Sequence, residues 1–219
     1  MIALASDAAR RYLQPMTVYL HEGDLPDDLD LGPVVAVDSE TMGLRFRRDP
    51  LCVVQLSSGD GDAHVVRLNR PAYDCPNLKR VMADPDVLKL FHFGRFDIGM
   101  FQLHLGVETR PVYCTKIASK LARTYTDRHG LKDVVRECAG VELSKAQQSS
   151  DWGSPVLTQA QLDYAASDVL YLHAVRARLD EMLEREGRTE LARKCFDFLP
   201  TRSALDLAGW DEQDIFAHA

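Results

Sequence analysis

Short apolar runs separated by turn residues dominate the first half of the chain. Residues 34–37 form a β-branched run that predicts a buried strand. Residues 51–56 and 63–68 predict two more strands, because the glycine-rich turn at 58–61 separates them. Three consecutive strands of this kind predict an antiparallel meander.

A fourth strand and a helix are expected next, before a largely helical second half. Residues 88–91 predict the strand, and the amphipathic stretch 96–105 predicts a helix that ends at Gly106. Residues 111–114 are a candidate fifth strand. This order is typical of an α/β fold with a mixed sheet flanked by helices.

The strongest helix signal begins at Thr158. Gln161 completes a capping box with this threonine, and Leu157 can pack on Leu162. The pattern predicts one helix from Thr158 to about residue 186. A short final helix over 190–198 should end before Pro200, since proline interrupts helical hydrogen bonding.

Length and composition are those of an ordinary globular protein. The 219 residues are 46% hydrophobic and 27% charged, which allows one sizeable core. We expect a single domain over residues 1–219, with its core at about 34–186 and a C-terminal helix and docking tail at about 188–219. The net charge of -7 argues against a broad basic surface for long nucleic acid. A polyanionic substrate would therefore be held locally.

Neither a membrane protein nor a disulfide-rich secreted protein is predicted. No apolar run approaches the roughly 20 residues that span a bilayer. Asp7 precedes Arg10 and Arg11, whereas a secretory signal begins with positive charge, so we expect a cytoplasmic protein. The five cysteines are odd in number and form no C-x-x-C pair, so we expect buried thiols rather than disulfides or zinc ligands.

Five side chains at element ends carry the candidate chemistry. Asp38 and Glu40 are two residues apart at the end of the first strand, so both carboxylates project from one face. Asp97 opens the helix after the fourth strand, and Tyr164 and Asp168 lie one turn apart on one helix face. Each has a structural alternative: a solvated strand end, a helix-capping acid or a helix surface. Asp168, however, has apolar neighbours, among which an acid requires a cation.

Carboxylates from three separate segments suit a pair of hard divalent cations. Magnesium prefers oxygen ligands. Two such ions about 3.5–4 Å apart activate water on one side of a phosphodiester and stabilise the leaving oxygen on the other. The candidate metal ligands are Asp38, Glu40, Asp97 and Asp168.

The same three segments resemble a known enzyme family. VDSET at 37–41, HFGRFD at 92–97 and YAASD at 164–168 look like the three motifs of the DEDD 3′-to-5′ exonucleases, in the subclass with tyrosine in the third motif. SKAQQSSDW at 144–152 is similar to the ribonuclease D group in particular.

The short nanoRNase C proteins are more similar still, over nearly the whole chain. This similarity is carried by LCVVQLSSGDG at 51–61, CTKIASK at 114–120, TYTDRHGL at 124–131, GW at 209–210 and DIFAH at 214–218. The resemblance implies an RNase H-like fold and an exoribonuclease, dependent on Mg²⁺ or Mn²⁺, that acts on very short RNA, with dinucleotides as the expected substrate. It also implies a homo-octameric ring, and DNA stays open as a further substrate.

The resemblance implies a role for each catalytic residue. Asp38 bridges both metal ions, while Glu40 and Asp168 complete the site that activates water. Asp97 serves the leaving-group metal, largely through water. Tyr164 orients or deprotonates the attacking water.

Three further residues are implied in substrate binding. The Thr41 backbone approaches the terminal 3′-hydroxyl, and Leu44 matches an apolar wedge between the last two bases. Phe93 stands where many relatives have asparagine, four residues before Asp97. This departure removes a polar contact and opens a stacking role for the phenylalanine.

Basic residues around the 124–130 loop are candidates for contacts to a 5′-phosphate. Arg123, Arg128 and His129 can supply charge-assisted hydrogen bonds, with ordinary loop charge as the alternative. Lys145 is open between an ion pair and a phosphate contact. His92 is expected to pack or hydrogen-bond in the core rather than bind metal.

Hydrolysis of short RNA to nucleoside 5′-monophosphates is the predicted function, and the same residues allow three alternatives. The main alternative is a general exonuclease like ribonuclease D, acting on longer RNA or DNA. Only about fifty residues follow Asp168, so we do not expect the accessory helical domains of longer relatives. A phosphatase using the same metals would release inorganic phosphate. A non-catalytic scaffold is disfavoured because no motif carboxylate is missing.

The end of the chain carries an unusual apolar load. Exposed side chains of this kind favour docking on the same domain or on a neighbouring subunit. We therefore expect an obligate homo-oligomer, on the basis of Leu205, Leu207, Trp210, Ile215 and Phe216.

Overall fold

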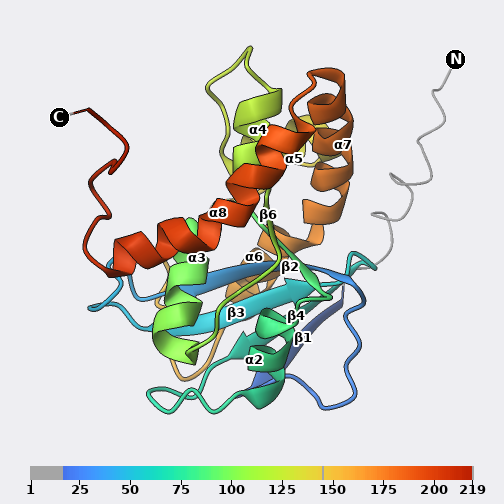
Figure 1. The fold of residues 1–219 in the computed structure, drawn as a ribbon. Helices are drawn as coiled ribbons and strands as arrows, with labels where there is room; N and C mark the ends of the chain where they lie inside the picture. Colours follow the sequence, from blue (N-terminus) through green and yellow to red (C-terminus); the bar gives the residue numbers. More distant parts are fainter. Residues whose placement is uncertain (1–16, 145, 219) are drawn as a thin grey trace, which may run out of the picture.

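One mixed sheet forms the centre of the molecule (Figure 1). The computed structural model describes residues 17–144 and 146–218, so Asp7, Arg10, Arg11 and Lys145 lie outside the described residues. The sheet has six strands in the order β1-β4-β3-β2-β5-β6. The strands are β1 (Thr17–Glu22), β2 (Val34–Thr41), β3 (Leu51–Ser57), β4 (Asp62–Arg67), β5 (Leu88–Phe91) and β6 (Val112–Cys114).

The meander predicted from the sequence is confirmed. β2 pairs antiparallel with β3, and β3 pairs antiparallel with β4. β1 joins β4 in parallel on one side, and β5 and β6 extend the other side in parallel with β2. The carboxyl ends of β2, β5 and β6 therefore meet at one edge of the sheet.

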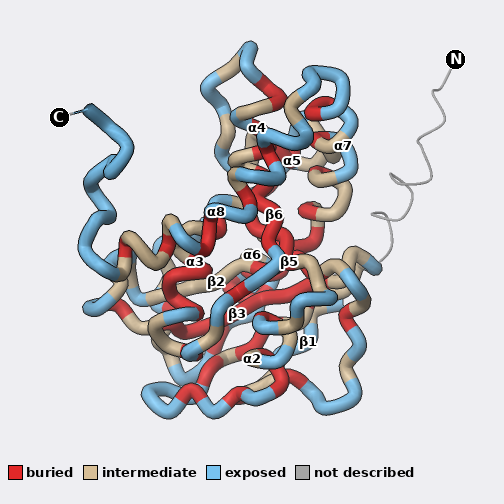
Figure 2. Tube along the Cα trace, in the orientation of Figure 1, coloured by how far each residue is buried: buried red, intermediate tan, exposed pale blue. Residues whose placement is uncertain are grey.

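Helices cover the sheet and extend beyond it. They are α2 (Pro76–Ala83), α3 (Arg95–Met100), the π-helix η1 (Phe101–Leu105), α4 (Thr115–Ala122), α5 (Leu131–Ala139), α6 (Gln159–Leu170), α7 (Leu172–Arg185) and α8 (Thr189–Leu207). α6 lies against β1 to β4, whereas α8 packs on α3 and β6. Figure 2 shows the buried trace running through the strands and the inner helix faces.

Several local predictions are confirmed. Thr158 accepts from the Gln161 backbone N–H in a complete capping box, and Leu157 and Leu162 share one buried cluster. The expected helix over 96–105 is α3 continued by η1, and it ends at Gly106 with φ 69°. All five cysteines are free; Cys52, Cys75 and Cys114 are buried and the other two are half-buried.

The single helix predicted from Thr158 to about residue 186 is wrong. α6 ends at Leu170 and α7 begins at Leu172, with Tyr171 at φ -100° and ψ -3° between them. α6 packs on the meander, whereas α7 packs on α4 and α5. One straight helix cannot reach both surfaces, so the chain bends at Tyr171.

The prediction that Pro200 ends a helix is also wrong, because α8 continues through it to Leu207. Tertiary bonds hold the C-terminal half of α8. Ser203 Oγ donates to the Arg95 carbonyl at 2.7 Å, and Asp206 pairs with the Arg95 guanidinium at 2.5 Å. These contacts offset the helical hydrogen bond that proline cannot donate.

The first strand, β1, precedes residue 34, where the sequence predicts that the core begins. β1 is an edge strand with mostly exposed side chains, so it lacks the apolar alternation that reveals a strand in sequence.

Within residues 17–144 and 146–218, no helix is long and apolar enough to cross a membrane.

Candidate active site

Three segments of the chain, β2, α3 and α6, bring their carboxylates together at one edge of the sheet. Asp38 and Glu40 come from the end of β2, and Asp168 comes from α6, which lies across β2 and β3. One carboxylate oxygen from each of these three residues lies within 4.8 Å of the others. The structure therefore assembles this part of the predicted site.

Asp97 joins the same cavity from the first turn of α3. Its side chain is buried, and Ser39 Oγ donates to Asp97 Oδ1 at 2.5 Å. The helix N-terminus further stabilises negative charge at this position. The start of α3 thus directs a buried carboxylate toward the carboxylates of β2.

The cavity above these acids has a volume of about 990 Å³. Tyr164, Thr41, Leu44 and Phe93 also line it; their catalytic and substrate-binding roles stay predictions. Leu44 is 81% exposed, so its apolar side chain projects freely from the loop after β2. A register shift between Glu40 and Thr41 turns the chain out of the ladder there.

The basic residues of the 124–130 loop are not part of the cavity that the carboxylates line. Arg128 and His129 do not belong to the cavity lining, although Gly130 does. His129 Nδ1 is 2.9 Å from Ser119 Oγ. Arg123 is buried and ion-paired with Glu137, so it serves the packing of the loop. Contacts of Arg128 and His129 to a 5′-phosphate stay a prediction.

His92 behaves as the sequence analysis expects. Its Nδ1 lies 2.9 Å from Thr115 Oγ1, and that hydroxyl donates to the Phe91 carbonyl. Burial lowers the pKa of His92 to about 3, with Lys116 adding to this effect. The imidazole is therefore neutral, and it lines the cavity with its Nδ1 held by Thr115.

Two lysines of the cavity were missed by sequence reasoning. Lys116 follows β6 and places its Nζ 4.0 Å from the ring centroid of Phe93. Lys132 also lines the cavity, and its Nζ lies 3.7 Å from Glu142 Oε2. Phe93 has φ 72°, a strained value for a bulky residue. The signal for Lys116 was its place directly after a parallel strand, at the edge where the carboxylates meet.

Burial disfavours the charged forms of the four acids, and repulsion from neighbouring carboxylates adds to this for Asp38, Glu40 and Asp168. Burial raises the pKa of Glu40 to about 9, with Asp168 and Asp97 adding to the shift. Burial likewise raises the pKa of Asp168 to about 7 and of Asp97 to about 6, and raises that of Asp38. The charged groups acting on Asp38 and Glu40 are other carboxylates. Crowded hard oxygen donors of this kind fit divalent cations.

Metal-free protein should lose stability as the pH rises from about 7 to about 9. Unfolded Glu40 titrates near pH 4.3, so the folded chain binds more protons than the unfolded chain up to the raised pKa of about 9. The free energy of unfolding therefore falls with rising pH in this window. Thermal melts in EDTA measure the effect.

Two comparisons sharpen this prediction. Glu40→Gln should flatten the fall in melting temperature, because it removes the carboxyl group whose pKa is raised to about 9. The stabilisation by added Mg²⁺ should grow with pH, since bound metal displaces protons. A melting temperature in EDTA that rises over this window would contradict the assignment.

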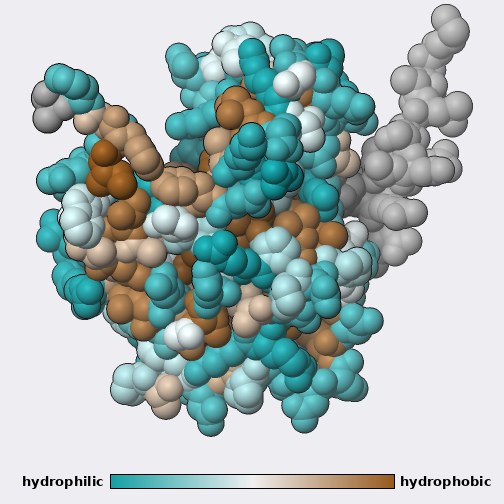
Figure 3. Space-filling model, viewed as in Figure 1, coloured by the Kyte–Doolittle hydropathy of each residue, from teal (hydrophilic) through white to brown (hydrophobic). Residues whose placement is uncertain are grey.

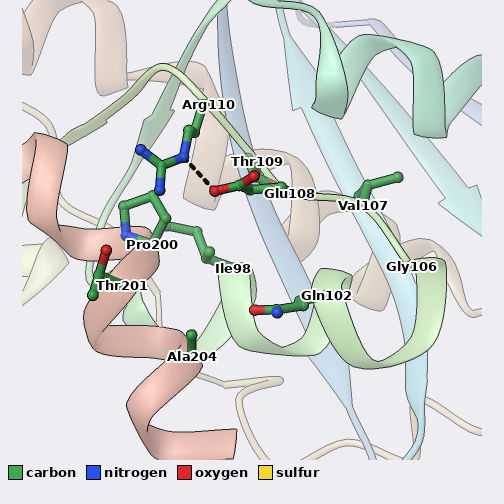
Figure 4. A pocket seen from close by; sticks show the side chains of 10 residues that line it. All are labelled: Ile98, Gln102, Gly106, Val107, Glu108, Thr109, Arg110, Pro200, Thr201 and Ala204. Carbon is green, nitrogen blue, oxygen red and sulfur yellow. Dashed lines mark hydrogen bonds and ion pairs between the residues drawn. The ribbon is translucent and has the colours of Figure 1, made fainter.

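A second cavity of about 410 Å³ lies away from the carboxylates (Figure 4). It is formed by the loop after η1 and by α8. Its charged side chains Glu108 and Arg110 pair with each other at 2.6 Å. None of the predicted site residues lines it.

Comparison with known proteins identifies the family. The family model for the 3′-5′ exonuclease domain matches residues 23–184. Ribonuclease D of Granulibacter bethesdensis is 39% identical over 156 residues, which cover 71% of this chain but only 39% of that protein. The chain thus spans about two fifths of the length of this curated relative.

Solved structures agree with this result. Brucella melitensis NrnC is 55% identical with a TM-score of 0.90, and the match covers 93% of this chain and 99% of that one. Similar structures of that protein contain bound Mg²⁺ or pGG. Escherichia coli RNase D is 27% identical with a TM-score of 0.67, over 78% of this chain and 45% of that one.

These matches confirm the RNase H-like fold of the DEDD exonucleases and cover all three motifs that form the cavity. The chain therefore belongs to the 3′-5′ exonuclease family, in its ribonuclease D-like group and close to NrnC.

Proposed function

We propose that this protein is a 3′-5′ exoribonuclease that depends on divalent metal ions and hydrolyses short RNA, preferentially dinucleotides, to nucleoside 5′-monophosphates. The observation that carries the proposal is the convergence of Asp38, Glu40, Asp97, Asp168 and Tyr164 on one cavity. The Mg²⁺ and pGG bound by the Brucella melitensis relative support the metal and the substrate class.

The four carboxylates are the proposed ligands of two divalent ions, Mg²⁺ or Mn²⁺. Asp38 lies among the other acids and would hold metal together with Glu40 and Asp168 beside it. Asp97 would complete the ligand set, with its carboxylate oriented by Ser39. When bound, the metal supplies activated water and stabilises the leaving oxygen.

Tyr164 is the proposed residue that orients the attacking water. Burial, and then the Asp168 carboxylate, raises the pKa of Tyr164 above its ordinary range. The phenol therefore keeps its proton near neutral pH. Of the two roles open for this tyrosine, donating a hydrogen bond to position the water is favoured over deprotonating it.

The substrate is proposed to lie along the cavity between the carboxylates and Lys116. The Thr41 backbone contacts the 3′-hydroxyl, and Leu44 separates the two bases. The exposed ring of Phe93 offers a stacking surface backed by the Lys116 cation. Gly130 brings the 124–130 loop to the rim of the cavity, from which Arg128 and His129 meet the 5′-phosphate.

Product analysis with a 5′-phosphorylated RNA dinucleotide tests the function. We expect nucleoside monophosphate to be released in Mg²⁺ and none to be released in EDTA. Release of inorganic phosphate instead would show a phosphatase. An intact dinucleotide under all metal conditions would contradict the proposal.

A general exonuclease acting on longer RNA or DNA is the second candidate function. The similarity to ribonuclease D over 71% of this chain supports it. The single domain over residues 1–219 and the cytoplasmic location stay predictions.

We also predict that the protein assembles into a homo-oligomer, with an octameric ring as the expected form. The segment after α8 is held to the same chain by bonds from Arg95 and Arg202 to the Asp211 and Trp210 carbonyls and by the contact of Phe216 with Phe198. It also carries apolar side chains to the surface (Figures 1 and 3). Trp210, Ile215 and Phe216 are 43%, 48% and 74% exposed. Burying such side chains is worth roughly 1.5–3 kcal/mol each, which favours docking on a neighbouring copy.

Light scattering on the full chain measures this assembly. We expect a particle several times the 24.6 kDa of one chain. Removing the apolar side chains with Ile215→Ser and Phe216→Ser should shift the population toward smaller species. A full-length monomer at micromolar concentration would contradict the prediction.

A further inference from the structure

Gln55 is a polar side chain in the middle of a fully buried strand. Every residue of β3 is buried, and Gln55 is 0% exposed. Its partners across the two ladders are Asp38 on β2 and Val65 on β4. A buried amide destabilises a fold unless its polar atoms are hydrogen-bonded. A glutamine at this position therefore requires an explanation.

The only side-chain hydrogen bond of Gln55 within the described residues goes to Asp38. Gln55 Nε2 donates to Asp38 Oδ2 at 2.7 Å. The amide oxygen Oε1 is buried and has no hydrogen-bond partner in the described part of the chain. The side chain is thus satisfied only where it meets the carboxylate.

The charge of the neighbourhood makes a neutral donor useful. Asp38 is crowded by Asp97, Asp168 and Glu40, which repel its carboxylate. A lysine or arginine in place of Gln55 would hold Asp38 but would also cancel charge that attracts a cation. An amide N–H fixes the carboxylate and leaves its charge available to the metal.

We propose that Gln55 is a positioning residue that holds the Asp38 carboxylate in the orientation that binds metal. Because its partner is set by the β2–β3 register, the rigid sheet holds this orientation before a cation arrives. This inference rests on the proposed metal dependence of the site.

Ser57 provides a matched control within the same strand. It lies two residues further along β3, on the same face, and is also 0% exposed. Its Oγ donates to the Asp62 carbonyl at 2.7 Å, away from the carboxylates. Ser57→Ala therefore removes two hydrogen bonds from β3, this one and the one that the Gly59 N–H donates to Ser57 Oγ, without touching Asp38.

The experiment compares Mg²⁺ binding by wild-type protein, Gln55→Met and Ser57→Ala, using calorimetry without RNA. Met has a similar length and no donor. Groups that orient metal ligands typically contribute about 10–100-fold in metal affinity. We expect a loss of this size for Gln55→Met and no loss for Ser57→Ala. Thermal melts in EDTA report the fold independently of metal.

The outcomes separate a positioning role from a structural one. Mg²⁺ affinity of Gln55→Met within about twofold of wild type, or an equal loss in Ser57→Ala, would overturn the proposal. If Gln55→Met does not fold, Gln55→Asn keeps a buried amide but is one carbon too short to place its N–H on Asp38, and it should weaken Mg²⁺ binding likewise. RNA hydrolysis is assayed separately, so wild-type protein that binds Mg²⁺ without cleaving RNA would refute the proposed function alone.

Discussion

Asp168→Asn protein should fold normally and lose at least about 10³-fold in RNA hydrolysis, because it lacks one of the charged oxygen ligands that hold the metal. Asp38→Asn should behave in the same way. Asp38 and Asp168 lie with Glu40 in the cluster of ligand atoms within 4.8 Å of one another. The amide keeps the volume of the side chain but removes its charge.

Stability distinguishes this loss from misfolding. Each substitution removes repulsion among buried acids, so the melting temperature in EDTA should not fall near pH 8. Asp163→Asn is the matched control, since Asp163 is exposed on the same helix and accepts a hydrogen bond from Gln159 Nε2 at 2.8 Å. Wild-type turnover by Asp168→Asn would contradict the assignment of the metal ligands.

Tyr164→Phe should lower kcat by about 10²–10⁴-fold while leaving Mg²⁺ affinity unchanged. The phenol is the proposed donor to the attacking water, and its hydroxyl faces the Asp168 carboxylate. Phenylalanine keeps the ring that packs 6.0 Å from Trp152, so the substitution removes the hydroxyl without disturbing the packing.

Steady-state kinetics and Mg²⁺ calorimetry measure both parts of this prediction. A fall in kcat with unchanged Mg²⁺ affinity supports an orienting role. A kcat that stays within about threefold of wild type would remove Tyr164 from the mechanism. A loss of Mg²⁺ affinity equal to that of Asp168→Asn would instead place the phenol among the metal-holding groups.

The carboxylates were predictable because their signals are local. Two acids spaced by two on a strand share a face, and residues spaced by four on a helix do so as well. The sequence does not say that β2, α3 and α6 converge on one cavity. That step came from the resemblance of three motifs to one family.

The elements that were missed depend on tertiary context. β1 is an exposed edge strand that forms by pairing with β4, far along the chain. α8 continues through Pro200 because its Ser203 and Asp206 bind Arg95 of α3. Gln55 and Lys116 gain their significance from Asp38 and Phe93, residues that meet them only in the folded sheet.

The most direct test of the central claim is a series of 5′-phosphorylated RNAs from two to about ten nucleotides, hydrolysed in Mg²⁺. The net charge of -7 offers little attraction to a long phosphate backbone. We predict that kcat/KM is highest for the dinucleotide and falls with each added nucleotide, with nucleoside 5′-monophosphate as the product. Values that stay flat or rise with length would show a general exonuclease and contradict the proposed specificity.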